Sequence, residues 1–331
     1  MGDLIARNRT EMAVLGNLWT PPNSKFTDGT LPNHFWVSKG GADGAGNGAF
    51  DNPYLTIRRA IRESVDGRGD VLHVGPGIWR EHLDIGSGTT VSGSSGGYAK
   101  RNLKLLADGG AHQGVTQIVG DGTTEQATIR VQSGYLRGSV LKGFELDNVN
   151  SSDAGRAYPC LELVTSDVGT LTATSGDYHG LIEDIDIVSD NVVTTGILLT
   201  GTTKAKFKRL TIAGCVVGIA WRGSPNNTPD NLKFWDVVFH DNTTADIASY
   251  SSGEVIGAMN ATNIQFFRPQ FMDRGGTPVT NYANISGTTV NCGFYEFDAA
   301  RDVADGTLMQ LPVDWIAIGN SAAAAEFIIG A

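Results

Sequence analysis

Residues 207–212 read Phe-Lys-Arg-Leu-Thr-Ile: an apolar residue, two variable residues, a second apolar residue, one variable residue and a third apolar residue. This spacing of apolar residues occurs six times in the second half of the chain. The copies are Leu141/Phe144/Leu146, Ile182/Ile185/Ile187, Phe207/Leu210/Ile212, Phe234/Val237/Phe239, Phe266/Pro269/Phe271 and Cys292/Tyr295/Phe297. The last apolar residues of successive copies are 41, 25, 27, 32 and 26 residues apart. Steps of this length are typical of a chain that completes one turn of a solenoid per repeat.

The spacing inside each copy indicates strands. One outward residue separates the last two apolar residues, and no copy continues the i, i+3, i+4, i+7 spacing of a helix. A second short apolar strand follows four of the copies, at 161–163, 197–199, 219–221 and 247–249. The pattern predicts an all-β protein, a single-stranded right-handed parallel β-helix whose coils lie about 4.8 Å apart. A β-sandwich is the alternative, but the Asn-Gly and Asp-Gly hairpin signals that would join its strands are scarce between these runs.

The composition fits one elongated domain. The chain has 331 residues, 43 glycines and 18% charged residues, which suits tight turns and buried strands. Its net charge of −10 argues against nucleic acid or an anionic membrane as a partner. No apolar run is long enough to span a membrane, and the first residues lack the apolar stretch of a secretory signal. Cys160, Cys215 and Cys292 form no CxxC pair, so buried free thiols are predicted instead of a zinc site or a disulfide framework.

The first third of the chain carries a family resemblance. From Ser38 a Gly-rich loop runs into Asn52-Pro53-Tyr54 and a short amphipathic helix near 56–64, for which Thr56 is the expected N-cap. Gly69-Asp70-Val71 and a Pro-Gly turn follow. This order resembles the start of proteins with the pectate-lyase-like right-handed β-helix, most closely the β-helix proteins of bacteriophage tailspikes and virions. Members include pectin-cleaving lyases, glycan hydrolases and structural virion proteins, so the fold alone does not assign the chemistry.

Three segments are predicted. Residues 1–37 do not fit the repeat and form an arm, which is either a docking segment or a structural lid. Residues 38–300 form the β-helix, and the resemblance implies that the helix near 56–64 covers the open end of its first coil. Residues 301–331 leave the repeat and end in apolar stretches, which indicates a C-terminal cap or an oligomerisation segment.

Outward residues at equivalent positions of successive coils are expected to form columns. The column between the last two apolar residues reads Glu145, Asp186, Thr211, Val238, Gln270 and Glu296. Two carboxylates on adjacent coils would lie about 5 Å apart, near the separation that retaining glycosidases use. Glu145 and Asp186 are therefore the candidate catalytic residues, although the step of 41 residues from one to the other leaves room for an extra coil.

The preceding column alternates in charge: it reads Gly143, Asp184, Arg209, Asp236 and Arg268. Alternating charges predict a surface ladder of ion pairs. The resemblance to pectate lyases implies an alternative, in which an arginine abstracts a proton and aspartates hold calcium. Calcium needs about six to eight converging oxygens, and a column that alternates with arginine supplies too few. The ladder is therefore favoured, and no metal or other cofactor is expected.

Three side chains near 207–240 are candidates for glycan binding: Trp221, Trp235 and His240. Aromatic faces beside polar groups are typical of sugar-binding sites. Phe234, which is close to them in sequence, fits the inward pattern and is assigned to the core.

These features favour a structural virion protein of a bacteriophage, namely a spike, fibre or head-decoration protein that adheres to surface glycans. It would be made in the host cytoplasm without a signal peptide and assembled into the virion. The expected partners are two further copies of the chain in a homotrimer, other virion proteins and host surface polysaccharide, with no nucleic acid and no membrane. The alternative is a tailspike polysaccharide depolymerase, either a glycoside hydrolase or a lyase, but no specific catalytic motif supports it.

Overall fold

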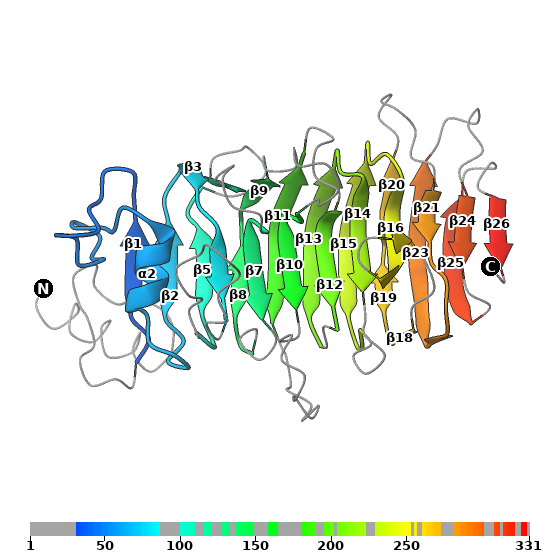
Figure 1. Ribbon diagram of the computed structural model, residues 1–331, viewed down its shortest axis with the longest axis horizontal. Coiled ribbons are helices and arrows are strands. Elements are labelled where there is room, and N and C mark those ends of the chain that lie inside the picture. Colours follow the sequence, from blue (N-terminus) through cyan, green and yellow to red (C-terminus); the bar gives the residue numbers. More distant parts are fainter. Residues whose placement is uncertain are drawn as a thin grey trace, which may run out of the picture.

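The computed structural model describes residues 31–86, 100–109, 116–120, 127–132, 137–148, 158–164, 180–189, 195–201, 204–222, 229–252, 255–256, 260–272, 281–300, 308–311, 314–321 and 326–329. These residues form an elongated stack of strands, with the N-terminal elements at one end and the C-terminal elements at the other (Figure 1). The described part of the chain has no helix that is long and apolar enough to cross a membrane.

Each coil contributes strands to two long sheets. In the first, which we call the corner sheet, every full coil bends once. Its strands are β1 (His34–Val37), β2 (Val71–Val74), β3 (Gly77–Arg80), β5 (Lys104–Ala107), β6 (Thr116–Gly120), β8 (Val140–Lys142), β9 (Glu145–Asn148), β11 (Leu181–Val188), β13 (Lys206–Ala213), β15 (Lys233–His240), β19 (Gln265–Phe267), β20 (Gln270–Met272), β23 (Cys292–Ala300) and β25 (Trp315–Ser321).

The second sheet closes the coils on the other side. Its strands are β4 (Leu83–Ile85), β7 (Ile129–Gln132), β10 (Leu161–Val164), β12 (Thr195–Thr200), β14 (Val217–Arg222), β16 (Ala245–Ser252), β17 (Val255–Ile256), β21 (Asn281–Asn284), β24 (Leu308–Leu311) and β26 (Glu326–Ile329). A short pair, β18 (Ala261–Thr262) and β22 (Thr289–Val290), completes the described strands. Among these named strands every pairing is parallel except that of β16 with β17. The fold is the predicted right-handed parallel β-helix.

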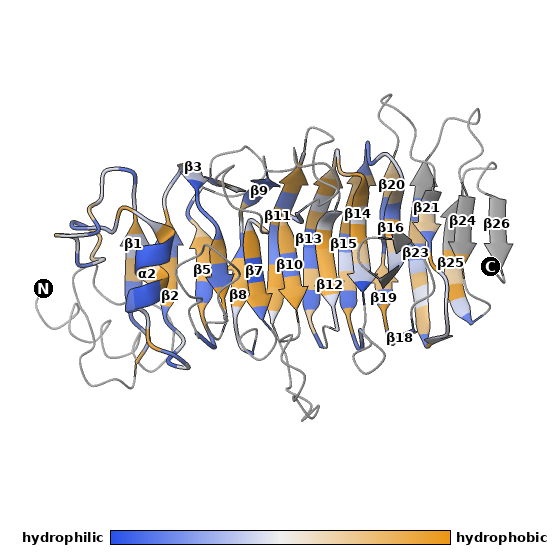
Figure 2. Ribbon diagram, viewed as in Figure 1, coloured by the Kyte–Doolittle hydropathy of each residue, from blue (hydrophilic) through white to orange (hydrophobic). Residues whose placement is uncertain are grey.

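Inward side chains of the corner sheet stack from coil to coil. Phe207, Phe234 and Phe266 are aligned by the strand register, and neighbouring rings lie 4.3 Å apart between centroids. Hydrophobic and hydrophilic residues alternate along many of the strands (Figure 2). The side of the helix that faces the viewer is hydrophilic. The predicted inward stack is confirmed, because each of its members is at most 1% exposed: Ile185, Ile187, Leu210, Ile212, Val237 and Phe239.

Each of these coils bends at one residue in the left-handed backbone conformation. This residue lies just before the second apolar residue of the repeat. The corner residues are Gly143 (φ 84°), Asp184 (54°), Arg209 (51°), Asp236 (55°), Arg268 (52°) and Glu296 (55°). Strand pairing resumes directly after the corner, as in β11, where Glu183 and Ile185 both pair with β13. Because left-handed backbone costs a non-glycine residue about 1–2 kcal/mol, the corners must be stabilised by the packing around them.

Among the described residues, the corners form two of the ion pairs of the predicted ladder, Asp184–Arg209 and Asp236–Arg268. The Arg209 guanidinium donates to both carboxylate oxygens of Asp184, at 2.5 and 3.1 Å. Arg268 binds Asp236 in the same two-point manner, at 2.7 and 2.9 Å. The hydrogen bond from Arg209 lowers the pKa of Asp184. Exposed pairs of this kind stabilise a fold by about 0.2–1 kcal/mol each, so they offset part of the cost of the corner conformation.

The last predicted copy, Cys292/Tyr295/Phe297, is placed two residues too early. The pairing of β23 with β19 and β20 aligns Phe266 with Phe294 and Phe271 with Ala299. A register shift between Tyr295 and Phe297 occurs only in the pairing of β23 with the next strand, β25. Tyr295 therefore points outward, and Glu296 is the corner residue. The member of the Glu145 column in this coil is Asp298, which pairs with Gln270. Cys292 is buried before the strand bends, and all three cysteines are buried free thiols, as predicted.

The coils extend beyond the predicted limits at both ends. β1 begins at His34, inside the predicted arm, and pairs with β2. After residue 300, β25 pairs with β23 and β26 pairs with β24, so the predicted C-terminal segment continues both sheets. Residues 1–30 of the predicted arm lie outside the described residues.

The predicted capping helix is α2 (Ile57–Glu63), which packs against β1 and β2 at the N-terminal end of the stack (Figure 1). Thr56 is its N-cap, and the Thr56 hydroxyl accepts a hydrogen bond from the Arg59 amide at 3.1 Å. Ile57, Ala60 and Ile61 are buried on one face. The amphipathic pattern therefore placed both the helix and its cap correctly.

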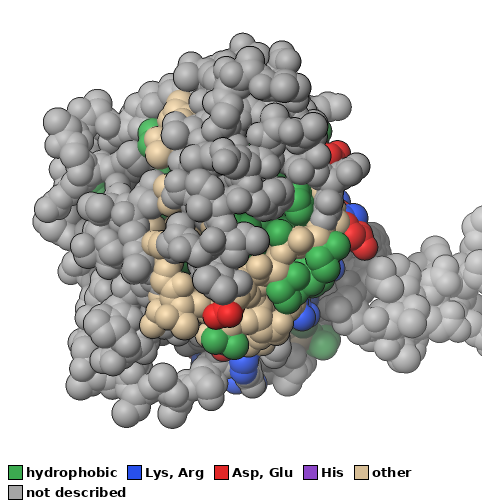
Figure 3. Space-filling view, turned by 90° about the vertical axis from the view of Figure 1, so that its right-hand side faces the viewer, with side chains coloured by type: hydrophobic (Ala, Val, Ile, Leu, Met, Phe, Trp, Pro, Cys, Tyr) green, Lys and Arg blue, Asp and Glu red, His purple; other side chains and the backbone are tan. Residues whose placement is uncertain are grey.

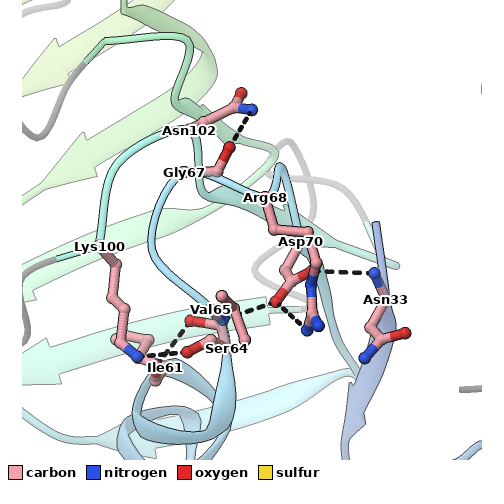
Figure 4. A network of polar contacts seen from close by, with 9 residues as sticks. All are labelled: Asn33, Ile61, Ser64, Val65, Gly67, Arg68, Asp70, Lys100 and Asn102. Carbon is pink, nitrogen blue, oxygen red and sulfur yellow. Dashed lines mark hydrogen bonds and ion pairs between the residues drawn. The ribbon is translucent and has the colours of Figure 1, made fainter. Parts of the chain in front are cut away.

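A buried carboxylate ties the end of α2 to the first coil (Figure 4). Asp70 accepts hydrogen bonds from the Asn33 and Val65 amides, at 2.9 and 2.8 Å, and from the Arg68 guanidinium, at 2.5 and 2.6 Å. The Lys100 ammonium group donates to the carbonyl of Arg62, in the last turn of the helix, and to that of Ser64, the C-cap residue. Because Asp70 is fully buried, these bonds replace the water that its charge would otherwise need.

The corner conformation gives a stability prediction. Replacing Glu296 with Gly removes the left-handed cost of about 1–2 kcal/mol, against an entropic penalty of about 0.5–1 kcal/mol for the added glycine. Glu296→Gly is therefore expected to range from neutral to about 1.5 kcal/mol more stable in urea melts. The matched control is Asp298→Gly. Asp298 is an exposed acidic residue of the same strand, and its φ is not positive. This variant should be less stable than the wild type by about 0.5–1 kcal/mol. Equal losses in both variants would contradict the role given to the corner.

Candidate functional site

Glu145 and Asp186 lie on adjacent coils. They are direct partners in the parallel pairing of β9 with β11, which resolves the question left open by the step of 41 residues from one to the other. Most of the residues between them lie outside the described residues, and the described part of the interval includes β10. Equivalent residues of paired parallel strands are about 4.8 Å apart, so the two carboxylates belong to one site.

Gln117 extends this site by one coil. It pairs with Glu145, and its amide group donates to the Glu145 carboxylate at 2.7 Å. Burial raises the pKa of Glu145, and the negative charges of Asp186 and Asp147 raise it further, while the Gln117 hydrogen bond acts in the opposite direction. Asp186 is 8% exposed. The surroundings therefore favour the neutral form of Glu145 more than water does, and a carboxyl group with a raised pKa is the kind of group that serves as the acid in glycoside hydrolysis.

A column of aromatic side chains lies on the other side of the corner. Trp235, Phe267 and Tyr295 occupy the outward position just before the corner residue in three successive coils. The ring centroids of Trp235 and Phe267 are 5.5 Å apart, and those of Phe267 and Tyr295 are 5.2 Å apart, with interplanar angles of 14° and 17°. All three residues are partly exposed. We call this set the aromatic column.

The ends of the aromatic column differ in character. On the N-terminal side, the Lys208 ammonium group lies 5.7 Å from the centre of the Trp235 ring. On the C-terminal side, Ile318 is aligned with Tyr295 and is 59% exposed. The column thus continues as an exposed apolar strip, and such strips on soluble proteins are often binding surfaces.

Of the three predicted glycan-binding side chains, only Trp235 belongs to this column. Trp221 is instead fully buried, and its ring stacks on Trp315 with centroids 6.1 Å apart and an interplanar angle of 4°. The reason is strand alternation, because Trp221 has the same inward orientation as Ile219 in β14. His240 lies beyond the corner, at the end of β15, where its ring nitrogen contacts the Asp241 carboxylate at 2.8 Å.

Phe267 and Tyr295 were not predicted to bind. The signal was present in the sequence, because each residue directly precedes a corner position, as Trp235 does. The two predicted columns lie at the corner residues and between the last two apolar residues, so neither includes the position of Phe267. The predicted last copy places Tyr295 in the core, because that copy is two residues out of register.

Comparison with known proteins supports the fold. No protein-family model matches the sequence, and no curated protein matches it. Among solved structures, the GH136 lacto-N-biosidase from Eubacterium ramulus is 11% identical, with a TM-score of 0.50 over 90% of this chain and 65% of that one. Pectin methylesterase PemA from Erwinia chrysanthemi is 12% identical, with a TM-score of 0.43 over 89% of this chain and 87% of that one. A polygalacturonase from Erwinia carotovora ssp. carotovora is 9% identical, with a TM-score of 0.37 over 93% and 98% of the two chains.

At these identities the likeness concerns the fold alone. The chain is a right-handed parallel β-helix.

The raised pKa of Glu145 predicts a pH-dependent effect of Glu145→Gln. The folded state favours the protonated side chain, so ionised Glu145 lowers stability above its folded pKa. Glu145→Gln should therefore raise the urea midpoint at pH 7. The gain should disappear as the pH falls below about 4.3, the usual pKa of glutamate in an unfolded chain. Asp298→Asn, an exposed member of the same column, serves as the control and should show no comparable gain. A gain in Glu145→Gln that does not change with pH would contradict the assigned cause.

Proposed function

We propose that this protein binds polysaccharide through the aromatic column Trp235, Phe267 and Tyr295, and that it acts as an adhesive structural protein of a bacteriophage virion. The aromatic column is the observation that carries the glycan-binding part. The virion part rests on the resemblance of the sequence, and a spike, fibre or head-decoration protein fits it. The host surface polysaccharide is the proposed ligand.

The arrangement of the rings supports a ligand on the outer face. Three aromatic side chains would bury more apolar area if they pointed inward, yet here they lie outside a core that is already filled by Phe234, Phe266 and Phe294. Parallel rings about 5 Å apart along the coil axis present a continuous apolar surface. The apolar faces of successive sugar rings match such a surface, and flat rings lose little entropy on binding.

A homotrimer is the second part of the proposal. Ile316 and Ile318 on β25 are 41% and 59% exposed, and hydrophobic side chains gather on the described surface near the C-terminal end (Figure 3). Cyclic symmetry would cover the same apolar residues in every copy.

The glycan-binding part predicts a loss of affinity in column variants. Retardation in native gels that contain capsular or lipopolysaccharide preparations measures binding directly. Trp235→Ala and Tyr295→Ala are each expected to weaken retardation roughly 3- to 10-fold, because each removes one stacking surface. The matched control is Phe50→Ala, which truncates an aromatic residue that is 64% exposed but lies outside the column. Full retention of binding by both column variants would exclude the proposed surface.

Glycoside hydrolysis is a second candidate function, favoured by the adjacency of Glu145 and Asp186. The same incubations can be assayed for new reducing ends. The adhesive role predicts none, whereas release that is lost in both Glu145→Gln and Asp186→Asn would establish a hydrolase. Unsaturated products that absorb in the ultraviolet would instead indicate a lyase.

The trimer predicts an effect of charge on β25. Ile316→Glu combined with Ile318→Glu should convert a species of three chains into single chains in sedimentation experiments, because the carboxylates would be buried without partners. Lys206→Glu, on the outer face of an earlier coil, is the control and should leave the mass unchanged. Wild-type protein that sediments as a single chain at micromolar concentration would refute the trimer.

A further inference from the structure

A cavity of about 480 Å³ lies beside α2 and shares no lining residue with the acid pair or the aromatic column. Four arginines and two carboxylates line it: Arg58, Arg59, Arg62, Arg80, Asp43 and Glu81. Three of the arginines come from α2, and Arg80 is the last residue of β3. The volume falls in the range of small-molecule sites, so it can hold more than a bare ion.

The two carboxylates of the cavity are already engaged by the start of α2. Asp43 accepts the amides of Leu55 and Thr56, at 2.9 and 3.0 Å, and the Thr56 hydroxyl at 2.6 Å. Glu81 is buried and accepts the amides of Ile57 and Arg58, each at 3.0 Å. Their charges thus serve mainly to satisfy backbone donors that the helix itself leaves unpaired.

The guanidinium groups of these arginines have more N–H donors than they have carboxylate partners. Arg59 and Arg62 share the single carboxylate of Glu63, at 3.1 and 3.6 Å. Within the described ranges, no carboxylate forms an ion pair with Arg58 or Arg80. The Nε atom of Arg59 is buried and has no hydrogen-bond partner among the residues that the structure describes.

The spacing of the arginines on α2 destabilises the helix unless an anion is bound. Arg58 and Arg62 are four residues apart on one face of α2, where like charges destabilise a helix. A planar guanidinium group binds phosphate and carboxylate oxygens in a two-point manner, so an oxyanion would convert this repulsion into hydrogen bonds. The lining of this cavity has more positive than negative side chains, although the chain as a whole has a net charge of −10.

We propose that this cavity is a binding site for an oxyanion-bearing small ligand, held by Arg58 and Arg80 with Arg59 and Arg62 beside them. The shared chemistry is a phosphate or a carboxylate, carried for example by a phosphorylated or an acidic sugar. The site is independent of the proposed function, because none of its residues belongs to the aromatic column or to the acid pair.

Calorimetric titration of the full chain at constant ionic strength tests the site. The probes are inorganic phosphate, galacturonate and galactose. Saturable binding of phosphate or galacturonate is expected, with none for galactose, and the stronger of the two anions distinguishes a phosphorylated from a carboxylated ligand. The double variant Arg58→Gln/Arg80→Gln should weaken binding by at least about 10-fold, since two charge-assisted contacts are lost. Arg101→Gln, which removes an exposed arginine that pairs with Asp66 outside the cavity, should bind as the wild type does.

A labelling experiment on the wild-type protein covers the case in which the double variant does not fold. Phenylglyoxal modifies accessible arginines, and mass spectrometry locates the modified residues. The bound anion should protect Arg58 and Arg80 but not Arg101. The proposal is overturned if neither anion binds saturably to the wild type, if a folded double variant binds equally well, or if the anion gives no selective protection.

Discussion

The parallel, in-register pairing of each coil with the next is the constraint on which the rest of this structure depends. It holds residues at equivalent positions of successive coils about 4.8 Å apart, whatever their chemistry. Inside the coils, this spacing brings Phe207, Phe234 and Phe266 into ring contact. Outside, the same spacing produces the ion pairs at the corners and the aromatic column. A favourable residue at one position therefore gains most when the next coil carries a complementary residue at the same position.

The left-handed corner separates the two outer faces of the corner sheet. Residues just before it carry an ionic network in the earlier coils, where Lys142 and Arg209 both contact Glu183, and the aromatic column in the later ones. The outward position that follows the corner is occupied by Gln117, Glu145 and Asp186 in successive coils. Because the corner holds charged residues at positive φ, its geometry must be set by the strands on both sides and not by local preference. Stiff strands and fixed corners make both faces preorganised for binding.

The sequence predicted what depends on repetition and missed what depends on a single coil. The recurring apolar spacing was sufficient for the strands, the inward stack and the ion pairs, because each of these follows from many copies. The conformation of the corners was not foreseen, since Asp, Arg and Glu rarely adopt positive φ. The last copy was misplaced because Cys292/Tyr295/Phe297 and Phe294/Phe297/Ala299 both fit the apolar spacing, and only the pairing with β19 and β20 shows that the second set is in register. The adjacency of Glu145 and Asp186 could not be predicted, because the length of a loop does not determine the number of coils it spans.

The positions of the two outer sites bear on the choice between adhesion and hydrolysis. Trp235 lies two coils beyond Asp186, about 10 Å along the axis, and on the opposite side of the corner. A glycan that stacks on the aromatic column would have to cross the Asp184–Arg209 ion pair at the corner to reach the acid pair. Hydrolysis requires a scissile bond held between the two carboxyl groups, and binding along the column does not supply that position. Binding therefore needs only the column, whereas cleavage needs a second binding element beside Glu145, which is why the aromatic column carries the proposal and the acid pair does not.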